Sequence, residues 1–152
     1  MAGRLLGIAR HDRPRGPIET IDHARVTTEL GVAGDFRGAA KPGSKRRRQV
    51  TVMAAADWAA ATAELGVALD WSVRRVNLLV DGIDLPREEG ALLRFDGGLV
   101  LEVTGECDPC SRMETIAPGL KAVLTPFWRG GITTRVIADG DLSIGAEVRI
   151  ER

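Results

Sequence analysis

The chain has 152 residues, of which 44% are apolar and 28% charged, and its 21 basic and 21 acidic residues balance at neutral pH. A chain of this length buries one core, so we expect a single domain over residues 1–152. Balanced charge gives no overall field toward nucleic acid or membrane, no apolar run is long enough to cross a bilayer, and the first residues lack a signal-peptide pattern. We therefore expect a cytoplasmic protein with reduced cysteines and with neither nucleic-acid nor membrane partners.

The first half of the chain predicts short strands and one clear helix. We expect strands at residues 4–10, 26–28 and 49–53, which are rich in apolar or β-branched side chains. A glycine-rich loop at residues 31–38 separates the second strand from the third. The alanine-rich run at residues 55–65 predicts a helix, because Gly66 follows it and can end it.

The second half predicts more short strands with glycine-rich turns. A buried strand is expected at residues 77–80, and Asp96-Gly97-Gly98 predicts a hairpin between strands at 92–94 and 99–104. A short helix at 118–124 and strands at 132–137 and 147–150 follow, with Asp139-Gly140 expected to turn into the last strand. Many short strands and few helices favour a mainly β fold, a barrel rather than an α/β sheet.

The two cysteines stand where an apolar strand ends and a helix is expected to begin. Asp108 would cap this helix and Pro109 suits its first position, which places Cys110 in the first turn. Unpaired N–H groups and the positive end of the helix dipole favour a thiolate there, and Arg112 lies beside it. Cys110 is therefore a candidate catalytic nucleophile, persulfide carrier or soft-metal ligand. The alternative is a small buried hydrophobic residue.

The Cys-x-x-Cys spacing has two further interpretations, and the rest of the chain argues against both. A thioredoxin-like redox pair needs a βαβ unit with several strands to follow, but only two good strands lie downstream. A closed structural zinc site needs four ligands, and the two histidines, His11 and His23, lie far upstream without finger spacing.

A dense basic run at residues 41–48 has three interpretations. It is a solvated loop, a nucleic-acid patch, or a segment whose end reaches an anionic ligand. The run is short and has no aromatic residue for base stacking, which argues against nucleic acid. We expect Arg46 and Arg47 to be solvated and Arg48 to face a ligand.

An ordered set of short motifs resembles a known domain family. The motifs are Gly34-Asp35-x-Arg37-Gly38, Arg48-Gln49-Val-Thr-Val, Arg75-x-Asn77-Leu78, Leu101-Glu-Val-Thr-Gly105, Asp108-Pro109-Cys110, Gly119-Leu120, Arg129-Gly130-Gly131 and Gly140-Asp-Leu-x-x-Gly145. In this order they resemble a small stand-alone MOSC domain, a family named after the C-terminal domain of molybdenum-cofactor sulfurases. The resemblance extends from residue 31 to residue 149.

The resemblance implies a mostly β, barrel-like domain whose family cysteine handles sulfur or molybdenum. The matching residue is Cys110, whereas the role of Cys107 stays open. In related amidoxime-reducing enzymes this cysteine ligates the metal of a molybdopterin cofactor. For stand-alone members, a sulfur-carrier role fed by a pyridoxal-phosphate cysteine desulfurase has been proposed. Arg37 stands where the commoner family pattern has a histidine. The arginine suits anion binding.

The phosphate and pterin of such a cofactor would need cationic and hydrogen-bonding partners. We expect Arg48, Arg75 and Arg129 to meet in one pocket near Cys110, and Asp35 to orient the guanidinium of Arg37. Taken alone, these side chains could equally form surface ion pairs or stabilise turns. The full set of expected cofactor-binding residues is Asp35, Arg37, Arg48, Arg75, Asn77, Arg112 and Arg129, with Cys110 as the metal ligand.

Three functions stay open at this point. The first is a molybdenum-cofactor-binding domain of an oxidoreductase system, with Cys110 on the metal and an electron-transfer partner. The second is a sulfur carrier with a persulfide on Cys110, received from a cysteine desulfurase. The third is a non-catalytic module that binds a phosphorylated small molecule.

Overall fold

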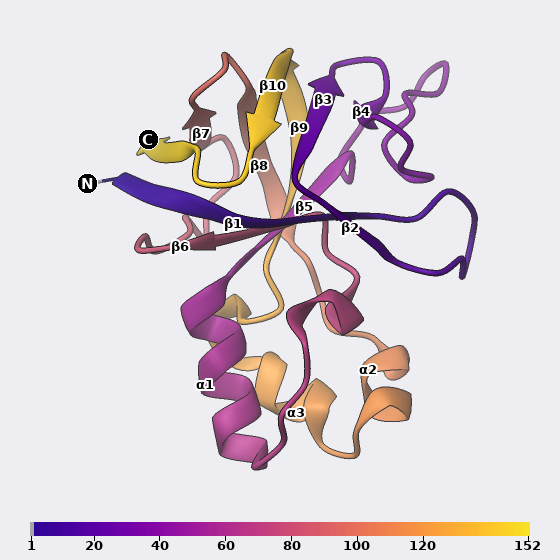
Figure 1. Ribbon diagram of the computed structural model, residues 1–152, viewed down its shortest axis with the longest axis vertical. Coiled ribbons are helices and arrows are strands. Elements are labelled where there is room, and N and C mark those ends of the chain that lie inside the picture. The colour runs from indigo at the N-terminus through magenta and orange to yellow at the C-terminus, as the bar shows by residue number, and fades with distance from the viewer. Residues whose placement is uncertain (1) are drawn as a thin grey trace.

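The computed structural model describes residues 2–152, and seven of the strands there close into a β-barrel (Figure 1). The order around the barrel is β1, β6, β5, β9, β8, β7 and β11, and the pairing of β11 with β1 closes the ring. Among the strand pairs of residues 2–152, only β5–β6 is parallel. The expected mainly β barrel is confirmed. The barrel strands are β1 (Ala2–Arg10), β5 (Val50–Ala54), β6 (Leu78–Asp81), β7 (Leu92–Phe95), β8 (Val100–Glu106), β9 (Ile132–Ala138) and β11 (Glu147–Glu151).

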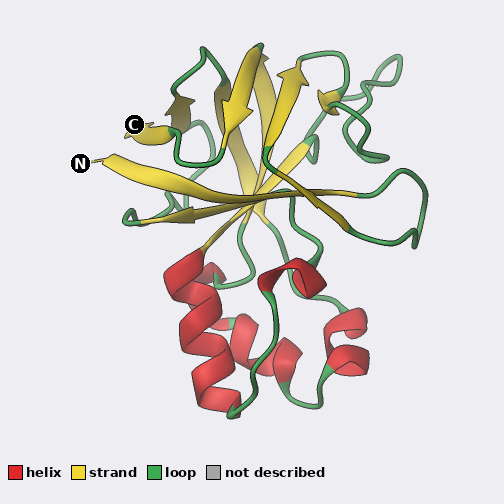
Figure 2. Ribbon diagram, viewed as in Figure 1, coloured by secondary structure: helices red, strands yellow, loops and turns green. Residues whose placement is uncertain are grey.

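A short strand, a small second sheet and a helix layer complete the fold. Strand β2 (Glu19–Ile21) pairs with β1, and β10 (Gly140–Ser143), β3 (His23–Thr27) and β4 (Gly31–Val32) form the second sheet. The helices gather at one end of the barrel (Figure 2). They are α1 (Ala55–Leu65), α2 (Ser111–Ile116), α3 (Leu120–Leu124) and the 3-10 helices η1 (Trp71–Arg74) and η2 (Pro126–Trp128).

Over residues 2–152, no helix has both the length and the apolar character needed to span a membrane.

Strand β5 joins the barrel to the helix layer. Val50, Val52 and Ala54 belong to the barrel core, whereas Met53 packs with the buried side chains of the helices. Side chains alternate between the two faces of a strand, so a strand between two apolar cores must be apolar on both faces. Because α1 follows β5 directly, the helix layer is fixed to this end of the barrel.

The local sequence signals gave most of the elements correctly. The expected helix at residues 55–65 is α1, and Gly66 ends it in the left-handed region with φ 72°. Gly97 and Gly98 have φ 95° and 96° in the predicted hairpin between β7 and β8. The expectation for Asp139-Gly140 was wrong, because Gly140 begins a further strand, β10, which pairs with β3. The sequence did not reveal β2 and β4, which have only three and two residues.

Buried Gln49 connects three segments that are far apart in the chain. Its side-chain nitrogen donates to the carbonyls of Thr28, at 2.9 Å, and Gly38, at 3.1 Å. Its side-chain oxygen accepts from the Val136 N–H at 2.9 Å and from Arg46 at 3.1 Å. Arg46 also donates to the Val136 carbonyl at 2.9 Å, so the expectation that it stays solvated was wrong. The basic run is thereby attached to β9.

We predict that Gln49→Leu lowers the free energy of unfolding by about 2–3 kcal/mol, because it leaves buried backbone groups without partners. Urea denaturation measures the change. The matched control is Arg47→Ala, which removes an exposed ion pair to Glu89 and should cost less than about 1 kcal/mol. Equal losses in the two variants would contradict the role given to Gln49.

Candidate functional site

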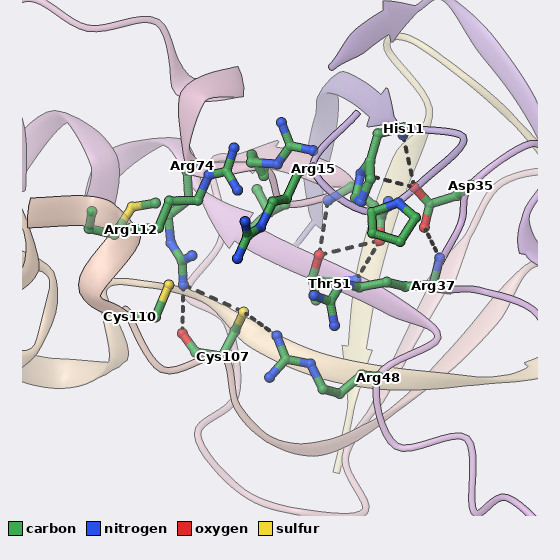
Figure 3. A pocket seen from close by; sticks show the side chains of 15 residues that line it. His11, Arg15, Asp35, Arg37, Arg48, Thr51, Arg74, Cys107, Cys110 and Arg112 are labelled. Carbon is green, nitrogen blue, oxygen red and sulfur yellow. Dashed lines mark hydrogen bonds and ion pairs between the residues drawn. The ribbon is translucent and has the colours of Figure 1, made fainter. Parts of the chain in front are cut away.

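A cavity of about 330 Å³ lies where the barrel meets the helix layer (Figure 3). Its walls come from the segment after β1, the loop before β5, the start of β6, η1 and the β8–α2 connection. Charged and sulfur-containing side chains dominate the lining. They are Arg15, Arg37, Arg48, Arg74, Arg75, Arg112, Asp35, Cys107 and Cys110, and the lining also includes His11, Thr51 and Asn77. Of the expected site residues, all but Arg129 line this cavity.

The lining carries six arginines and a single carboxylate, that of Asp35. Arg75 donates to the Gly16 carbonyl at 2.7 Å, which does not neutralise its charge. Burial lowers the pKa of Arg75, and the neighbouring charges of Arg112 and Arg37 lower it further. This arrangement favours a bound anion, because an anion would compensate mutual repulsion between the guanidiniums.

Asp35 fixes the backbone of the cavity wall. Its buried carboxylate accepts from the N–H of His11 at 3.1 Å and from the N–H of Arg37 at 3.3 Å. The Phe36 N–H in turn donates to the His11 carbonyl at 2.7 Å. The expectation that Asp35 orients the guanidinium of Arg37 was therefore wrong, since the bond is to the Arg37 main chain.

His11 is a cavity residue that the sequence did not single out. Only 8% of it is exposed, and its Nδ1 lies 3.7 Å from an Asp35 oxygen without a hydrogen-bond partner among the described residues. Burial lowers the pKa of His11; Asp35 opposes this, and the charges of Arg75 and Arg37 add to it. His11 therefore faces the same cavity as Arg37, in surroundings that favour its uncharged form. No local motif marks His11, because only tertiary packing brings the end of β1 to the site.

Asn77 lines the cavity but is engaged in joining strands. Its side-chain oxygen accepts from the Thr51 N–H at 3.0 Å, and its amide nitrogen donates to the Ala9 carbonyl at 3.1 Å. The Asn77 N–H also donates to the Thr51 hydroxyl at 3.0 Å. Asn77 thus ties β1, β5 and β6 together beneath the cavity, and one amide hydrogen is left for a ligand.

Cys110 lies two positions earlier relative to the helix than expected. It is the N-cap residue of α2, with extended backbone at φ −108° and ψ 178°, and no described side chain caps this helix. The expected Asp108 cap was therefore wrong. Cys110 is exposed at the cavity, whereas Cys107 is only 2% exposed. The two thiols differ in access to solvent, and Cys110 is the one that an incoming group can reach.

Two guanidiniums approach the buried thiol. Nη2 of Arg74 donates to the Cys107 carbonyl at 2.8 Å and lies 3.5 Å from its Sγ, and Nη2 of Arg48 lies 3.9 Å from the same sulfur. Arg74 is itself buried, and its Nε has no hydrogen-bond partner in the part of the chain that the structure describes. In the sequence, Arg74 and Arg75 offer two adjacent guanidiniums for a phosphate, but no local pattern predicts the contact of Arg74 with Cys107.

Arg129 lies outside the cavity. It forms an ion pair with Glu64 of α1 and donates to the Val123 carbonyl at 3.1 Å, so it belongs to the helix layer. The adjacent Gly130 packs against the site instead. A Cβ at this position would lie 2.7 Å from the Cys107 carbonyl oxygen, so a larger residue would displace the backbone of Cys107. The expectation that Arg129 meets Arg48 and Arg75 was wrong.

Comparison with known proteins identifies a family and a fold. The MOSC domain family matches residues 30–149. The YuaD protein from Bacillus subtilis has 20% identity and a TM-score of 0.80, with 99% of this chain and 96% of that chain covered. YiiM from Geobacillus stearothermophilus has 13% identity and a TM-score of 0.72, with 99% and 75% covered. YiiM from Escherichia coli has 19% identity and a TM-score of 0.66, with 98% and 70% covered. Among curated protein sequences, none matches this chain.

We predict that His11 makes stability depend on pH. Its pKa in the folded chain lies below the ordinary 6.5, so the unfolded chain binds more protons as the pH falls through this range. The contribution of His11 to the free energy of unfolding is fully present above pH 6.5. It is lost as the pH falls to the pKa of His11 in the folded chain. Urea denaturation across this pH range measures the free energy of unfolding. As the pH is lowered, this free energy should fall less steeply in His11→Gln than in the wild type.

The matched control is His23→Gln, which replaces an exposed histidine outside this cavity. If the free energy of unfolding of His11→Gln depends on pH as steeply as that of the wild type, His11 is not the cause of the dependence.

Proposed function

This chain belongs to the MOSC domain family, and from that premise we propose that its arginine-lined cavity binds a molybdenum cofactor of the molybdopterin type. One observation carries the proposal: an exposed thiol and a large excess of guanidinium charge line the same cavity. The Cys110 thiolate would face the metal, and the arginines would hold the anionic parts of the cofactor. The proposed function is thus cofactor binding within an oxidoreductase system, with a separate electron-transfer partner.

The residues present fit such a group. Guanidinium forks bind phosphate in two-point contacts, and Arg74 offers a buried N–H without a partner among residues 2–152. A thiolate suits thiophilic molybdenum. Over those residues no cluster of three or more His, Cys, Asp or Glu side chains could hold a metal ion. A metal bound here would therefore need to bring further ligands with it, as a dithiolene cofactor does.

The side chains would divide the work of binding. Arg37, Arg48 and Arg112, exposed at the cavity, would neutralise the phosphate, while half-buried Arg75 would lie deeper. Neutral His11 could accept a proton from a bound group, since burial favours its uncharged form. When bound, the cofactor would supply the redox chemistry of molybdenum.

A sulfur carrier is the second candidate function. The exposed Cys110 favours it, because a persulfide carrier needs a thiol that a donor can reach. A pyridoxal-phosphate cysteine desulfurase would be the donor. In this case the arginines would stabilise the negative charge of the persulfide. A module that only binds a phosphorylated small molecule would use the arginines and leave Cys110 without a role.

We predict that Cys110→Ser removes most of the molybdenum or sulfane sulfur that the wild type carries, because it replaces the reachable thiol. Metal analysis and sulfane-sulfur assay of protein purified from a molybdenum-replete host measure the loaded fraction. The matched control, Cys107→Ser, should keep most of the load.

Stoichiometric molybdenum supports the cofactor function, whereas sulfane sulfur without metal supports the carrier. Equal loading of wild type and Cys110→Ser would overturn both roles for this thiol.

A further inference from the structure

The buried thiol has a place in the cavity that cofactor binding does not explain. We infer that Cys107 is a second reacting thiol, which attacks a persulfide on Cys110, forms a Cys107–Cys110 disulfide and releases hydrosulfide into the cavity. This inference rests on the proposed function in its sulfur-carrying form. It assigns chemistry to Cys107, whose role the sequence left open.

Both thiols line one cavity and belong to one short connection. Only Asp108 and Pro109 separate them, and residues 107–110 lie outside any helix or strand. Figure 3 shows both sulfur atoms in the part of the cavity that also holds the Arg74 side chain. A disulfide between them would close a small ring within this connection.

Two guanidinium groups contact the sulfur of Cys107. Arg74 and Arg48 place guanidinium nitrogens 3.5 Å and 3.9 Å from its sulfur. Cationic donors beside a thiol stabilise the thiolate, which is the nucleophilic form. A cysteine that served only as a small hydrophobic residue would gain nothing from two cations at its sulfur. Cys107 lies at the border of the helix-layer core and the cavity, so its backbone is buried while its sulfur faces charge.

The guanidinium of Arg74 is held in place for this contact. It is buried and bonded to the Cys107 carbonyl at 2.8 Å. Gly130 leaves room for it, because a Cβ at that position would lie 2.9 Å from Arg74 Nη2. The Cys107 N–H donates to the Gly131 carbonyl at 2.9 Å, which fixes the backbone of Cys107. The two glycines after Arg129 therefore support the position of Cys107 and Arg74.

The reaction balances without a further oxidant. The Cys107 thiolate attacks the inner sulfur of the Cys110 persulfide, and a bond forms between the two cysteine sulfurs. The persulfide S–S bond breaks, and its electron pair leaves with the outer sulfur and its proton as HS⁻. The outer sulfur is reduced to sulfide while the cysteines are oxidised to a disulfide. A small thiol reductant then restores both thiols by disulfide exchange.

The test follows sulfur on the full chain. Reduced wild type, Cys107→Ser and Cys110→Ser are treated with inorganic polysulfide, desalted and kept without reductant, and then analysed for hydrosulfide and by intact mass. We expect the wild type to release one equivalent of hydrosulfide and to end as the disulfide, two hydrogens lighter than the reduced chain. Cys107→Ser should retain the extra sulfur at least about tenfold longer, because it lacks the attacking thiolate.

Arg48→Gln probes the guanidinium contact at an exposed position, where the fold is not at stake. It should slow disulfide formation per loaded sulfur, and a thermal melt checks that each variant is folded. Equally long retention of sulfur in wild type and Cys107→Ser would overturn this inference and leave the carrier function standing. If folded Cys107→Ser takes up no sulfur on Cys110, the carrier function and this inference both fail.

Discussion

The excess of guanidinium charge in one cavity is the constraint on which the site depends. Six arginines share a lining with one carboxylate, and that carboxylate is hydrogen-bonded to the main chain of His11 and Arg37. The lowered pKa of Arg75 reflects its burial first and the neighbouring arginines second. This arrangement favours a bound anion in the cavity, because the described side chains there supply too little negative charge to balance the arginines.

The fold holds these charges close together through buried polar groups. Asn77 joins β1, β5 and β6 under the cavity, and Gln49 attaches the glycine-rich loop and the basic run to β9. Such buried hydrogen bonds specify one arrangement of the walls, since leaving any of them unmade is costly. The helix layer adds the two cysteines at the start of α2. Barrel loops and helices both supply charge to this site, since Arg74 belongs to η1 and Arg112 to α2. Both sulfur atoms come from the β8–α2 connection.

Local signals predicted what depends on local physics. Gly66, Gly97 and Gly98 marked a helix end and a hairpin because their positive φ values favour glycine. Ordered motifs indicated the family, and with it the barrel. The sequence could not show that Asp35 binds main-chain N–H groups or that Arg129 pairs with Glu64, since both depend on which segments meet in space. His11 was missed for the same reason.

The melting temperature with and without pyrophosphate tests the central claim most directly, in the wild type and in Arg37→Gln at matched ionic strength. The account predicts that pyrophosphate raises the wild-type melting temperature beyond the effect of chloride. It also predicts that Arg37→Gln melts no lower than the wild type without the anion, because repulsion is relieved, and that it gains less from pyrophosphate. Arg129→Gln, outside the cavity, should gain as much as the wild type. Equal effects of pyrophosphate and chloride on the wild type would contradict an anion site in this cavity.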